Sequence, residues 1–285
     1  MSGPRKRLAG LGLAPSRFRG QNFIKDKSLA SHLASLILQS EQGGLEGEEL
    51  KKEPKRVVEI GPGLGALTEA LLEQGALVWA IEVDRGLASA LRLWRPAIDG
   101  SLKVIQADVL TFNLERDLGF KPDLVCGNLP YNISTPILFW FMDQKVGLGV
   151  FTLQKEMALR LIAPPGGRDY GRLTIAAALW HEVKILTTIS AASFFPRPKV
   201  ESALIALTKK PLELCPNLKP QSLSKLTLAA FHARRKTIFN NLAAAYGAEK
   251  ADKALKNLSL DPSLRPQTLA PKVLAALAVI LEEGG

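Results

Sequence analysis

Short apolar runs alternate with segments of helical periodicity over the first half of the chain. The runs cover residues 56–60, 77–81, 103–107 and 123–126, and each is followed by a glycine or an acid. After the first run, Leu67, Leu71 and Leu72 repeat at the spacing of an amphipathic helix. Because strands that alternate with helices in this way pair in one direction, the pattern predicts a doubly wound α/β fold with a largely parallel sheet.

The second half continues this alternation and then changes character. Helices are expected at 135–142, 155–162 and 173–180, and strands at 149–153, 183–189 and 202–207. The last two strands flank a proline-containing loop, which predicts a closing hairpin at the sheet edge. From about residue 209, short helical patterns follow a proline-marked linker. The pattern predicts a basic N-terminal arm over residues 1–19, a main α/β domain over 20–208 and a helical domain over 209–285.

Composition limits the class of protein and its partners. The chain has 285 residues, is 47% hydrophobic and carries a formal net charge of +10 with a pI near 9.6. This charge favours a polyanionic partner, and no apolar run approaches the roughly 20 residues of a membrane-spanning helix. Two cysteines make no disulfide framework, which suits a reducing, cytoplasmic location. The histidines are scattered without metal-ligand spacing, so no metal site is expected.

Residues 1–19 are basic and contain no acid. Their apolar centre, residues 8–14, is interrupted by glycine and too weak for a secretory signal. We expect a flexible basic arm that touches phosphates, with an organellar transit peptide as the alternative that composition leaves open. Residues 41–55 are charged and glycine-rich, and they are expected to form a solvated loop.

A glycine-rich turn follows the first strand of the α/β pattern. The residues 61–65, Gly-Pro-Gly-Leu-Gly, connect it to a helix, so a ligand can approach the backbone closely and face the helix N-terminus. Glu82 ends the next strand 21 positions after Gly61, where its carboxylate can accept hydrogen bonds from both ribose hydroxyls of a nucleoside. The pair indicates a cofactor that contains adenosine, although NAD enzymes use a similar arrangement.

Two further acids favour S-adenosyl-L-methionine over NAD. Glu59 begins the pattern Glu-x-Gly-x-Gly-x-Gly, and Asp108 ends the third strand, where it can accept a hydrogen bond from an adenine amine. The alternative is that both acids only cap strands. No acid or base suited to hydride transfer is evident, which argues against an NAD oxidoreductase.

The fourth strand leads into residues 127–131, Gly-Asn-Leu-Pro-Tyr. Side chains at such a strand end point into the crevice where α/β sheets bind ligands. The Asn128 amide can donate and accept, and Tyr131 offers a flat face, so together they could hold a planar amine such as a nucleobase. The alternative is a simple turn with a packed tyrosine. Cys126 is interpreted as a packing residue, because the RNA cytosine methyltransferases that use a cysteine nucleophile place it where Tyr131 stands.

In this order, these motifs resemble the KsgA/RsmA family of rRNA adenine N6,N6-dimethyltransferases over nearly everything from Phe18 to Val279. The segments that carry the resemblance are 20–23 (GQNF), 58–63 (VEIGPG), 127–134 (GNLPYNIS), 154–156 (QKE), 170–173 (YGRL), 198–200 (PKV) and 234–237 (RRKT). The resemblance implies a class I, Rossmann-like methyltransferase domain with a mostly parallel seven-stranded sheet, and a small all-α RNA-binding domain at the C-terminus.

The implied reaction moves methyl groups from S-adenosyl-L-methionine, leaving S-adenosyl-L-homocysteine. The acceptors are the N6 atoms of two adjacent adenosines in a hairpin loop near the 3′ end of 16S rRNA, during biogenesis of the small ribosomal subunit. The implied cofactor contacts are Asn22, Ile24, Gly61, Gly63, Glu82, Asp108 and Asn128. The implied target-base residues are Asn128, Leu129, Pro130 and Tyr131, with Phe194 as a second stacking surface.

The chain departs from the family pattern at three places. Residues 190–192, Ser-Ala-Ala, stand where the family usually has prolines, so Phe195 is an alternative to Phe194 as the stacking residue. Ile24 replaces the usual leucine and has a similar shape. The charged, glycine-rich loop 41–55 is longer than is typical of the family and has no assigned role.

Adenine N6 is a poor nucleophile because its lone pair is delocalised into the ring. Acceptors aimed at its hydrogens, the Asn128 side-chain oxygen and the Leu129 or Pro130 carbonyl, would favour a pyramidal nitrogen. No strong base is needed, so catalysis would depend on alignment and electrostatic complementarity. The base must also leave its stack, and new stacking on aromatic side chains would offset that cost.

Basic residues are expected to contact RNA phosphates. Phe231, Ile238 and Leu242 can share one face of a helix that leaves the basic run 234–236 pointing outward. The expected RNA-binding residues are Arg234, Arg235, Lys236, Arg197 and Lys199. The alternative for such a charge run is a solvated face.

The expected partner is 16S rRNA or the immature small subunit, and the chain is expected to act as a monomer. One alternative is an adenine methyltransferase of 23S rRNA. Another is a noncatalytic RNA-binding assembly or transcription factor on the same fold, which the intact Gly61, Glu82, Asp108 and Asn128 argue against.

Overall fold

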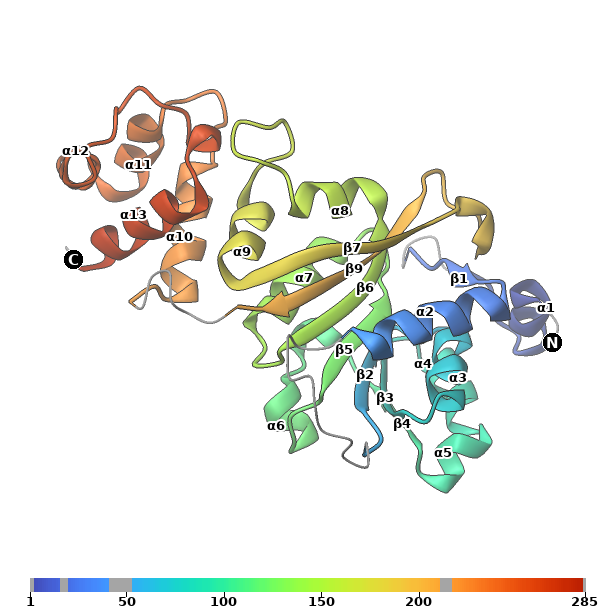
Figure 1. The fold of residues 1–285 in the computed structure, drawn as a ribbon. Coiled ribbons are helices and arrows are strands. Elements are labelled where there is room, and N and C mark those ends of the chain that lie inside the picture. The colour runs from blue at the N-terminus through green and yellow to red at the C-terminus, as the bar shows by residue number, and fades with distance from the viewer. Residues whose placement is uncertain (1–2, 16–19, 41–52, 211–216, 284–285) are drawn as a thin grey trace. The chain divides into compact units, whose positions relative to one another are not determined.

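A seven-stranded sheet lies at the centre of the fold (Figure 1). The computed structural model describes residues 3–15, 20–40, 53–210 and 217–283. The strand order is β4-β3-β2-β5-β6-β9-β7. These strands are β2 (Arg56–Ile60), β3 (Leu77–Glu82), β4 (Leu102–Gln106), β5 (Leu124–Asn128), β6 (Leu148–Gln154), β7 (His181–Ile189) and β9 (Ser202–Lys209). Pairing is parallel from β4 through β3, β2 and β5 to β6, which confirms the predicted doubly wound, mostly parallel sheet.

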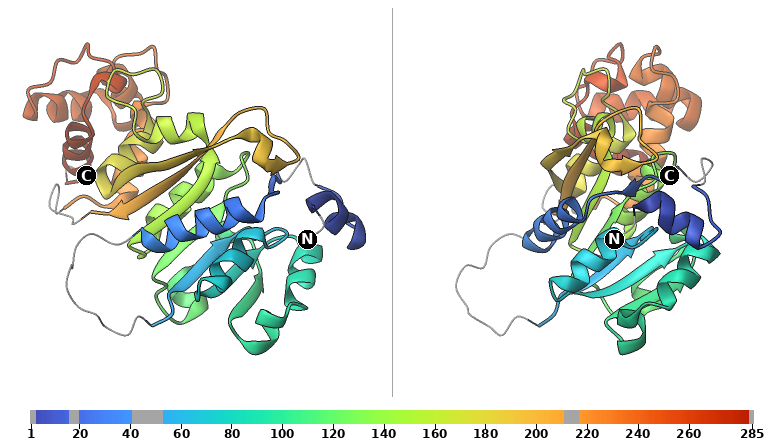
Figure 2. Two further views of the ribbon diagram at one scale, coloured as in Figure 1. Left: turned by 45° about the vertical axis from the view of Figure 1, so that its right-hand side comes forward. Right: turned by 90° about the vertical axis from the view of Figure 1, so that its right-hand side faces the viewer.

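Helices connect the parallel strands and cover both faces of the sheet (Figure 2). The helices of the N-terminal half are α1 (Pro4–Gly10), α2 (Lys27–Gln39), α3 (Ala66–Glu73), α4 (Arg85–Arg92), α5 (Arg95–Asp99), α6 (Leu114–Leu118) and α7 (Ser134–Asp143). The remaining helices of the chain are α8 (Lys155–Leu161), α9 (Arg172–Trp180) and, in the C-terminal helical region, α10 (Pro220–Ala230), α11 (Ile238–Tyr246), α12 (Ala248–Asn257) and α13 (Pro271–Glu283). On one face of the sheet, Leu33 of α2 and Leu71 of α3 share a buried core with Val57 and Leu124.

Strand β5 runs through Asn128 rather than ending at Cys126 as the sequence pattern predicts. Gly127 pairs with Phe151 of β6, and a Cβ atom on Gly127 would clash with the Ile60 carbonyl of β2. The missing side chain therefore lets β5 continue close to its neighbour. As a result Asn128 is the last residue of a rigid strand rather than part of a loop.

The closing strands lie where the sequence predicts them. β9 pairs antiparallel with β6, with Leu204 opposite Thr152, and β7 follows β9 at the edge of the sheet. Burial in β6 and β9 is nearly continuous, because both strands have neighbours on either side and are covered on their faces. Edge strand β7 is only partly buried along its length.

The chain divides into two compact units, residues 1–158 with 184–209, and residues 159–183 with 210–285. The sequence pattern groups residues 159–183 with the sheet instead. They cluster with the C-terminal helices because Tyr170 and Ile175 are buried in one core with residues such as Leu226 and Leu274. The Tyr170 hydroxyl also donates to the Leu269 carbonyl at 2.8 Å. The linker prolines 211 and 216 lie outside the described residues.

A second, two-stranded sheet was not foreseen from the sequence. β1 (Phe23–Ile24) pairs antiparallel with β8 (Phe194–Phe195), so that Phe23 lies opposite Phe195 and Ile24 opposite Phe194. This pairing brings the segment before α2 to the loop that joins β7 and β9. The pairing thereby fixes residues 23–24 beside residues 194–195, although the two segments are far apart in the chain.

The expectation of a flexible N-terminal arm is wrong for residues 4–10, which form helix α1. Leu8 is 2% exposed and packs in a cluster with Phe23, Leu64 and Leu87. The Arg7 guanidinium donates to the Leu64 carbonyl at 2.6 Å. Apolar burial and this hydrogen bond hold the helix against the glycine-rich turn.

Candidate functional site

A cavity of about 210 Å³ opens at the carboxyl ends of β2, β3, β4 and β5. The expected cofactor contacts that line it are Asn22, Ile24, Gly61, Gly63, Glu82, Asp108 and Asn128. Pro130 also lines the cavity, whereas Leu129, Tyr131 and Phe194 lie outside its described lining. The fold thus gathers four strand ends and the segment before β1 around one space.

The glycine turn between β2 and α3 leaves room for a ligand. Gly61 has φ 64°, in the left-handed region, and a Cβ atom there would meet no atom within 4 Å. Because Gly61 lines the cavity, a side chain at this position would enter the space that a ligand needs. Gly63 lines the cavity and is also packed closely, since a Cβ atom there would lie 2.9 Å from the Phe23 ring.

Glu82 is 4% exposed at the end of β3 and is held by backbone donors. Its Oε2 accepts from the Gly63 amide at 3.1 Å, and its Oε1 accepts from the Asp84 amide at 2.9 Å. Each carboxylate oxygen can accept more than one hydrogen bond, so further donors such as ribose hydroxyls have acceptors here. The carboxylate therefore holds the amide of Gly63 in the glycine turn, and Glu82 also lines the cavity.

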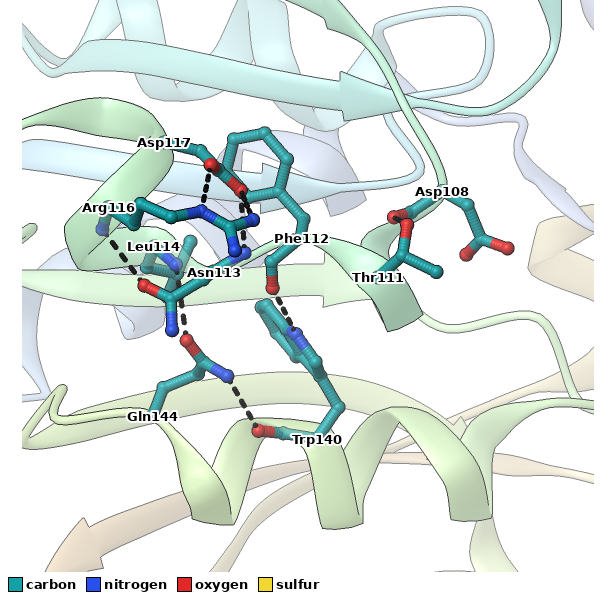
Figure 3. Close-up of polar contacts among 9 residues, drawn as sticks. All are labelled: Asp108, Thr111, Phe112, Asn113, Leu114, Arg116, Asp117, Trp140 and Gln144. Carbon is teal, nitrogen blue, oxygen red and sulfur yellow. Dashed lines mark hydrogen bonds and ion pairs between the residues drawn. The ribbon is translucent and has the colours of Figure 1, made fainter.

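Asp108 caps a short 3-10 helix, Val109–Thr111, and also lines the cavity. Its Oδ1 accepts from the Leu110 amide at 3.0 Å. Asp108 thus lines the cavity, as its expected ligand role requires, and caps the helix that follows β4 rather than the strand itself. Figure 3 shows this turn and the residues that follow it.

Asn128 holds its side chain in one orientation. Its Nδ2 donates to the Asn22 carbonyl at 2.6 Å, which fixes Nδ2 and Oδ1, since only the nitrogen can donate. Among the described residues, Oδ1 has no hydrogen-bond partner although it is shielded from solvent. A buried acceptor without a partner costs about 1–3 kcal/mol. A ligand that donates to Oδ1 would recover this free energy.

The two residues after Asn128 differ in the acceptors they offer. The Pro130 carbonyl already accepts from the Ile133 amide at 3.2 Å and from Ser134 Oγ at 2.8 Å. Since a carbonyl oxygen has two lone pairs, this acceptor is used within the turn. Leu129 is 1% exposed and its amide donates to the Thr152 carbonyl at 2.9 Å. Of the two expected carbonyl acceptors, that of Pro130 is thus already used within the turn.

The aromatic residues are held in different ways. The Tyr131 hydroxyl shares a hydrogen bond with Ser202 Oγ at 2.6 Å, and burial raises the pKa of Tyr131. Phe194 is 1% exposed and packs in the core shared by the sheet and helices α2 and α3, so it presents no open ring face. Phe195 is partly exposed and packs beside Phe23. Phe195 is therefore the more accessible of the two phenylalanines.

A buried acid lies at the base of the cavity. Glu59 is 1% exposed, lines the cavity and accepts from Thr68 Oγ1 at 2.6 Å. Burial raises the pKa of Glu59 to about 7. Neighbouring Cys126 is fully buried, and burial raises the pKa of its thiol, as befits a packing residue and not a nucleophile.

Several lining residues were not singled out from the sequence. Gln21, Val83, Val109 and Asn132 line the cavity. Val83 and Val109 directly follow Glu82 and Asp108, so the strand-end rule that found the acids also reaches them. Gln21 and Asn132 lie inside the sequence motifs that carry the family resemblance.

The expected RNA-binding helix is not formed. α10 ends at Ala230 and α11 begins at Ile238, so the basic run 234–236 lies in the turn between them. Thr237 caps α11, and the Asn241 side chain bonds the backbone of Ala233, which fixes the turn.

The basic residues of this turn are not equivalent. Arg234 donates to the carbonyls of Arg168 at 2.8 Å and Tyr170 at 3.3 Å, so it braces the loop before α9. Arg235 and Lys236 are exposed, as are Arg197 and Lys199 in the loop between β8 and β9. These four cations are available to solvent.

The part of the chain that the structure describes contains neither a candidate metal site nor a candidate membrane-spanning helix. Groups of three or more His, Cys, Asp or Glu side chains that could hold a metal ion do not occur there. Within the same residues, none of the helices is both long and apolar enough to cross a bilayer.

The profile of a family described as "Ribosomal RNA adenine dimethylase" matches residues 15–272. The chain belongs to this family. Relatives named "Ribosomal RNA small subunit methyltransferase A" from Myxococcus xanthus and Escherichia coli are each 36% identical. The Myxococcus match covers 97% of this chain and 94% of the relative, and the Escherichia coli match covers 95% and 94%.

Two solved structures share the fold. A dimethyladenosine transferase from Plasmodium falciparum superposes with a TM-score of 0.70 at 24% identity, over 90% of this chain and 95% of that one. The 23S rRNA methyltransferase ErmE gives a TM-score of 0.58 at 24% identity, over 91% and 99%. The chain therefore has the class I methyltransferase fold that the family resemblance implies.

Proposed function

We propose that this family member transfers methyl groups from S-adenosyl-L-methionine to N6 of two adjacent adenosines near the 3′ end of 16S rRNA. Family membership and relatives named for the small ribosomal subunit support the substrate class. The observation that carries the chemistry is the Asn128 side chain, whose buried Oδ1 acceptor belongs to a residue that lines the cavity. An exocyclic amine of a base is a donor suited to that acceptor.

The cavity residues fit the proposed cofactor. The empty space at Gly61 gives the glycine turn a surface that a ligand can approach, and the Glu82 carboxylate would accept from the ribose hydroxyls. Asp108 would accept from the adenine amine, and Asn22, Ile24 and Gly63 complete the wall. When bound, S-adenosyl-L-methionine supplies a methyl group that is already activated by its sulfonium.

The protein's own residues would then orient the acceptor base. Asn128 Oδ1 and the Leu129 carbonyl would accept from the two N6 hydrogens, because the Pro130 carbonyl is occupied within its turn. Tyr131 would stack on the base, and Phe195, which is more exposed than Phe194, would supply the second aromatic contact. Catalysis follows from holding these groups in line, without a strong base.

We further propose that Arg197, Lys199, Arg235 and Lys236 contact RNA phosphates. All four are exposed, and the net charge of +10 favours a polyanion. Arg234 takes part through the backbone that it braces and not as a free cation. Action on an immature small subunit, a cytoplasmic location and a monomeric state stay predictions.

The proposal is tested with labelled S-adenosyl-L-methionine and two substrates, undermethylated small subunits and large subunits. We expect label in small subunits only, with four methyl groups per subunit, two on each of two adenosines. Label confined to large subunits would instead favour 23S rRNA as the substrate. Absence of label from both, with the folded chain still bound to the subunit, would favour a noncatalytic assembly factor.

A further inference from the structure

The turn that carries Asp108 is hydrogen-bonded to the C-terminal end of helix α7 (Figure 3). Trp140 Nε1 donates to the Phe112 carbonyl at 2.7 Å. One helical turn later, Gln144 Oε1 accepts from the Leu114 amide at 3.2 Å, and Gln144 Nε2 donates to the Trp140 carbonyl at 3.2 Å. The segment after β4 is therefore tied to α7 at two successive points.

The brace is shielded and the turn is stiff. The Trp140 side chain belongs to a residue that is only 8% exposed, so water competes little for the Phe112 carbonyl. Within the turn, the Thr111 amide donates to the Asp108 carbonyl at 3.2 Å and the Phe112 amide to the Val109 carbonyl at 3.1 Å. A displacement of Phe112 would therefore reach Asp108 and Val109, and both line the cavity.

Helix α7 also carries the target-base motif at its N-terminal end. Ser134, its first residue, donates through Oγ to the Pro130 carbonyl at 2.8 Å. Ile137, Leu138 and Phe141 are buried and fix the helix in the core. One rigid element thus holds the Asn128–Tyr131 segment at one end and the Asp108 turn at the other.

We propose that Trp140 is a positioning residue of the cofactor cavity, which aims Asp108 at the adenine of S-adenosyl-L-methionine by holding the Phe112 carbonyl. Gln144 supports it from the Leu114 side. The inference rests on the proposed function only in the identity of the cofactor. By this inference the indole of Trp140 contributes to cofactor affinity although Trp140 does not line the cavity.

The test compares Trp140→Phe with Trp79→Phe, measured as the Kd of S-adenosyl-L-methionine by calorimetry in the absence of RNA. Phenylalanine keeps most of the packing of Trp140 and removes its N–H donor, so the Kd should rise about tenfold. Trp79, whose ring packs on Phe120 with centroids 4.6 Å apart, is the matched control and should change the Kd less than about twofold. At saturating cofactor, the kcat of Trp140→Phe should stay within about twofold of wild type.

A double substitution separates positioning from general damage. If Trp140 acts through Asp108, then Trp140→Phe should have almost no further effect on the Kd in an Asp108→Ala background. An unchanged Kd in the single variant, or the same tenfold loss in both backgrounds, would overturn the inference. If Trp140→Phe does not fold, Gln144→Met provides the same comparison, with an expected rise of about threefold that disappears in the Asp108→Ala background.

The outcome is independent of the proposed reaction. If the wild-type chain binds S-adenosyl-L-methionine and Trp140→Phe binds it equally well, only the role of Trp140 is contradicted. If the folded wild-type chain does not bind S-adenosyl-L-methionine, the proposed function itself fails.

Discussion

Replacing Asn128 with alanine removes one hydrogen bond that the structure shows and one that we propose, and the two serve different steps of the proposed reaction. The Nδ2 donor holds the carbonyl of Asn22 at 2.6 Å, and Asn22 lines the cavity as a proposed cofactor contact. The Oδ1 acceptor is buried and would meet N6 of the target adenosine. We therefore expect cofactor binding and methyl transfer to fall by different amounts.

The size of each loss follows from the kind of contact. An ordinary hydrogen bond such as that between Asn128 and Asn22 contributes about 0.5–1.5 kcal/mol, so the Kd of S-adenosyl-L-methionine should rise at most roughly tenfold. The Oδ1 acceptor is preorganised and shielded from water. We therefore expect its removal to affect kcat about as much as the removal of one hydrogen-bond donor from an oxyanion hole. Its removal should lower kcat about 10²–10³-fold.

The assay measures both quantities on one preparation. Calorimetry without RNA gives the cofactor Kd, and single-turnover transfer of labelled methyl to small-subunit rRNA at saturating cofactor gives the chemical step. Asn257→Ala, which removes an exposed amide at the end of α12, is the control and should match wild type in both. A kcat for Asn128→Ala within about threefold of wild type would refute the role of Oδ1, because loss of an acceptor that stabilises the transition state must lower kcat by more than that.

Three further predictions concern the cavity and the basic surface. Gly61→Ala should weaken S-adenosyl-L-methionine binding more than about tenfold, because its Cβ enters the cavity, whereas Gly75→Ala, with a similar positive φ in open space, should cost stability alone. Burial raises the pKa of Glu59 from 4.5 to about 7. Between these pH values the folded state keeps a proton on Glu59 that the unfolded state has released, so the free energy of unfolding should fall as the pH rises from about 4.5 to 7. Glu59→Gln should flatten this fall in thermal unfolding between pH 5 and pH 8, and an identical slope in the variant would contradict the burial argument. Arg235→Gln and Lys236→Gln should each reduce the slope of log K for RNA against log salt by about 1, and an unchanged slope would exclude the phosphate contact.

The sequence revealed the central sheet because its strands are buried on both faces. β5 and β6 are mostly apolar, and the acids or glycines at the ends of β2, β3, β4 and β5 mark the edge where the cavity opens. The same rule found Gly61, Glu82 and Asp108 as neighbours, although they are far apart in the chain. Local patterns sufficed here because the topology of parallel sheets is nearly fixed.

Tertiary pairing decided what the sequence did not reveal. β1 and β8 have two residues each, which is too short for a periodic signal, yet their pairing buries Phe194 and leaves Phe195 more exposed. In the basic run, the Asn241 side chain bonds the backbone of Ala233 and interrupts a helix that the apolar spacing predicts. Contacts between distant residues override local periodicity at both places.

The central claim is that one cavity holds a methyl donor beneath the glycine turn and aims it at an amine held by Asn128. A crystal structure of the chain with S-adenosyl-L-homocysteine and adenosine tests it most directly. The account predicts the ribose of the first ligand on Glu82, and N6 of the second within about 2.7–3.2 Å of Asn128 Oδ1. Adenosine bound outside the cavity, or with N6 turned away from Asn128 while the first ligand occupies its place, would contradict the account.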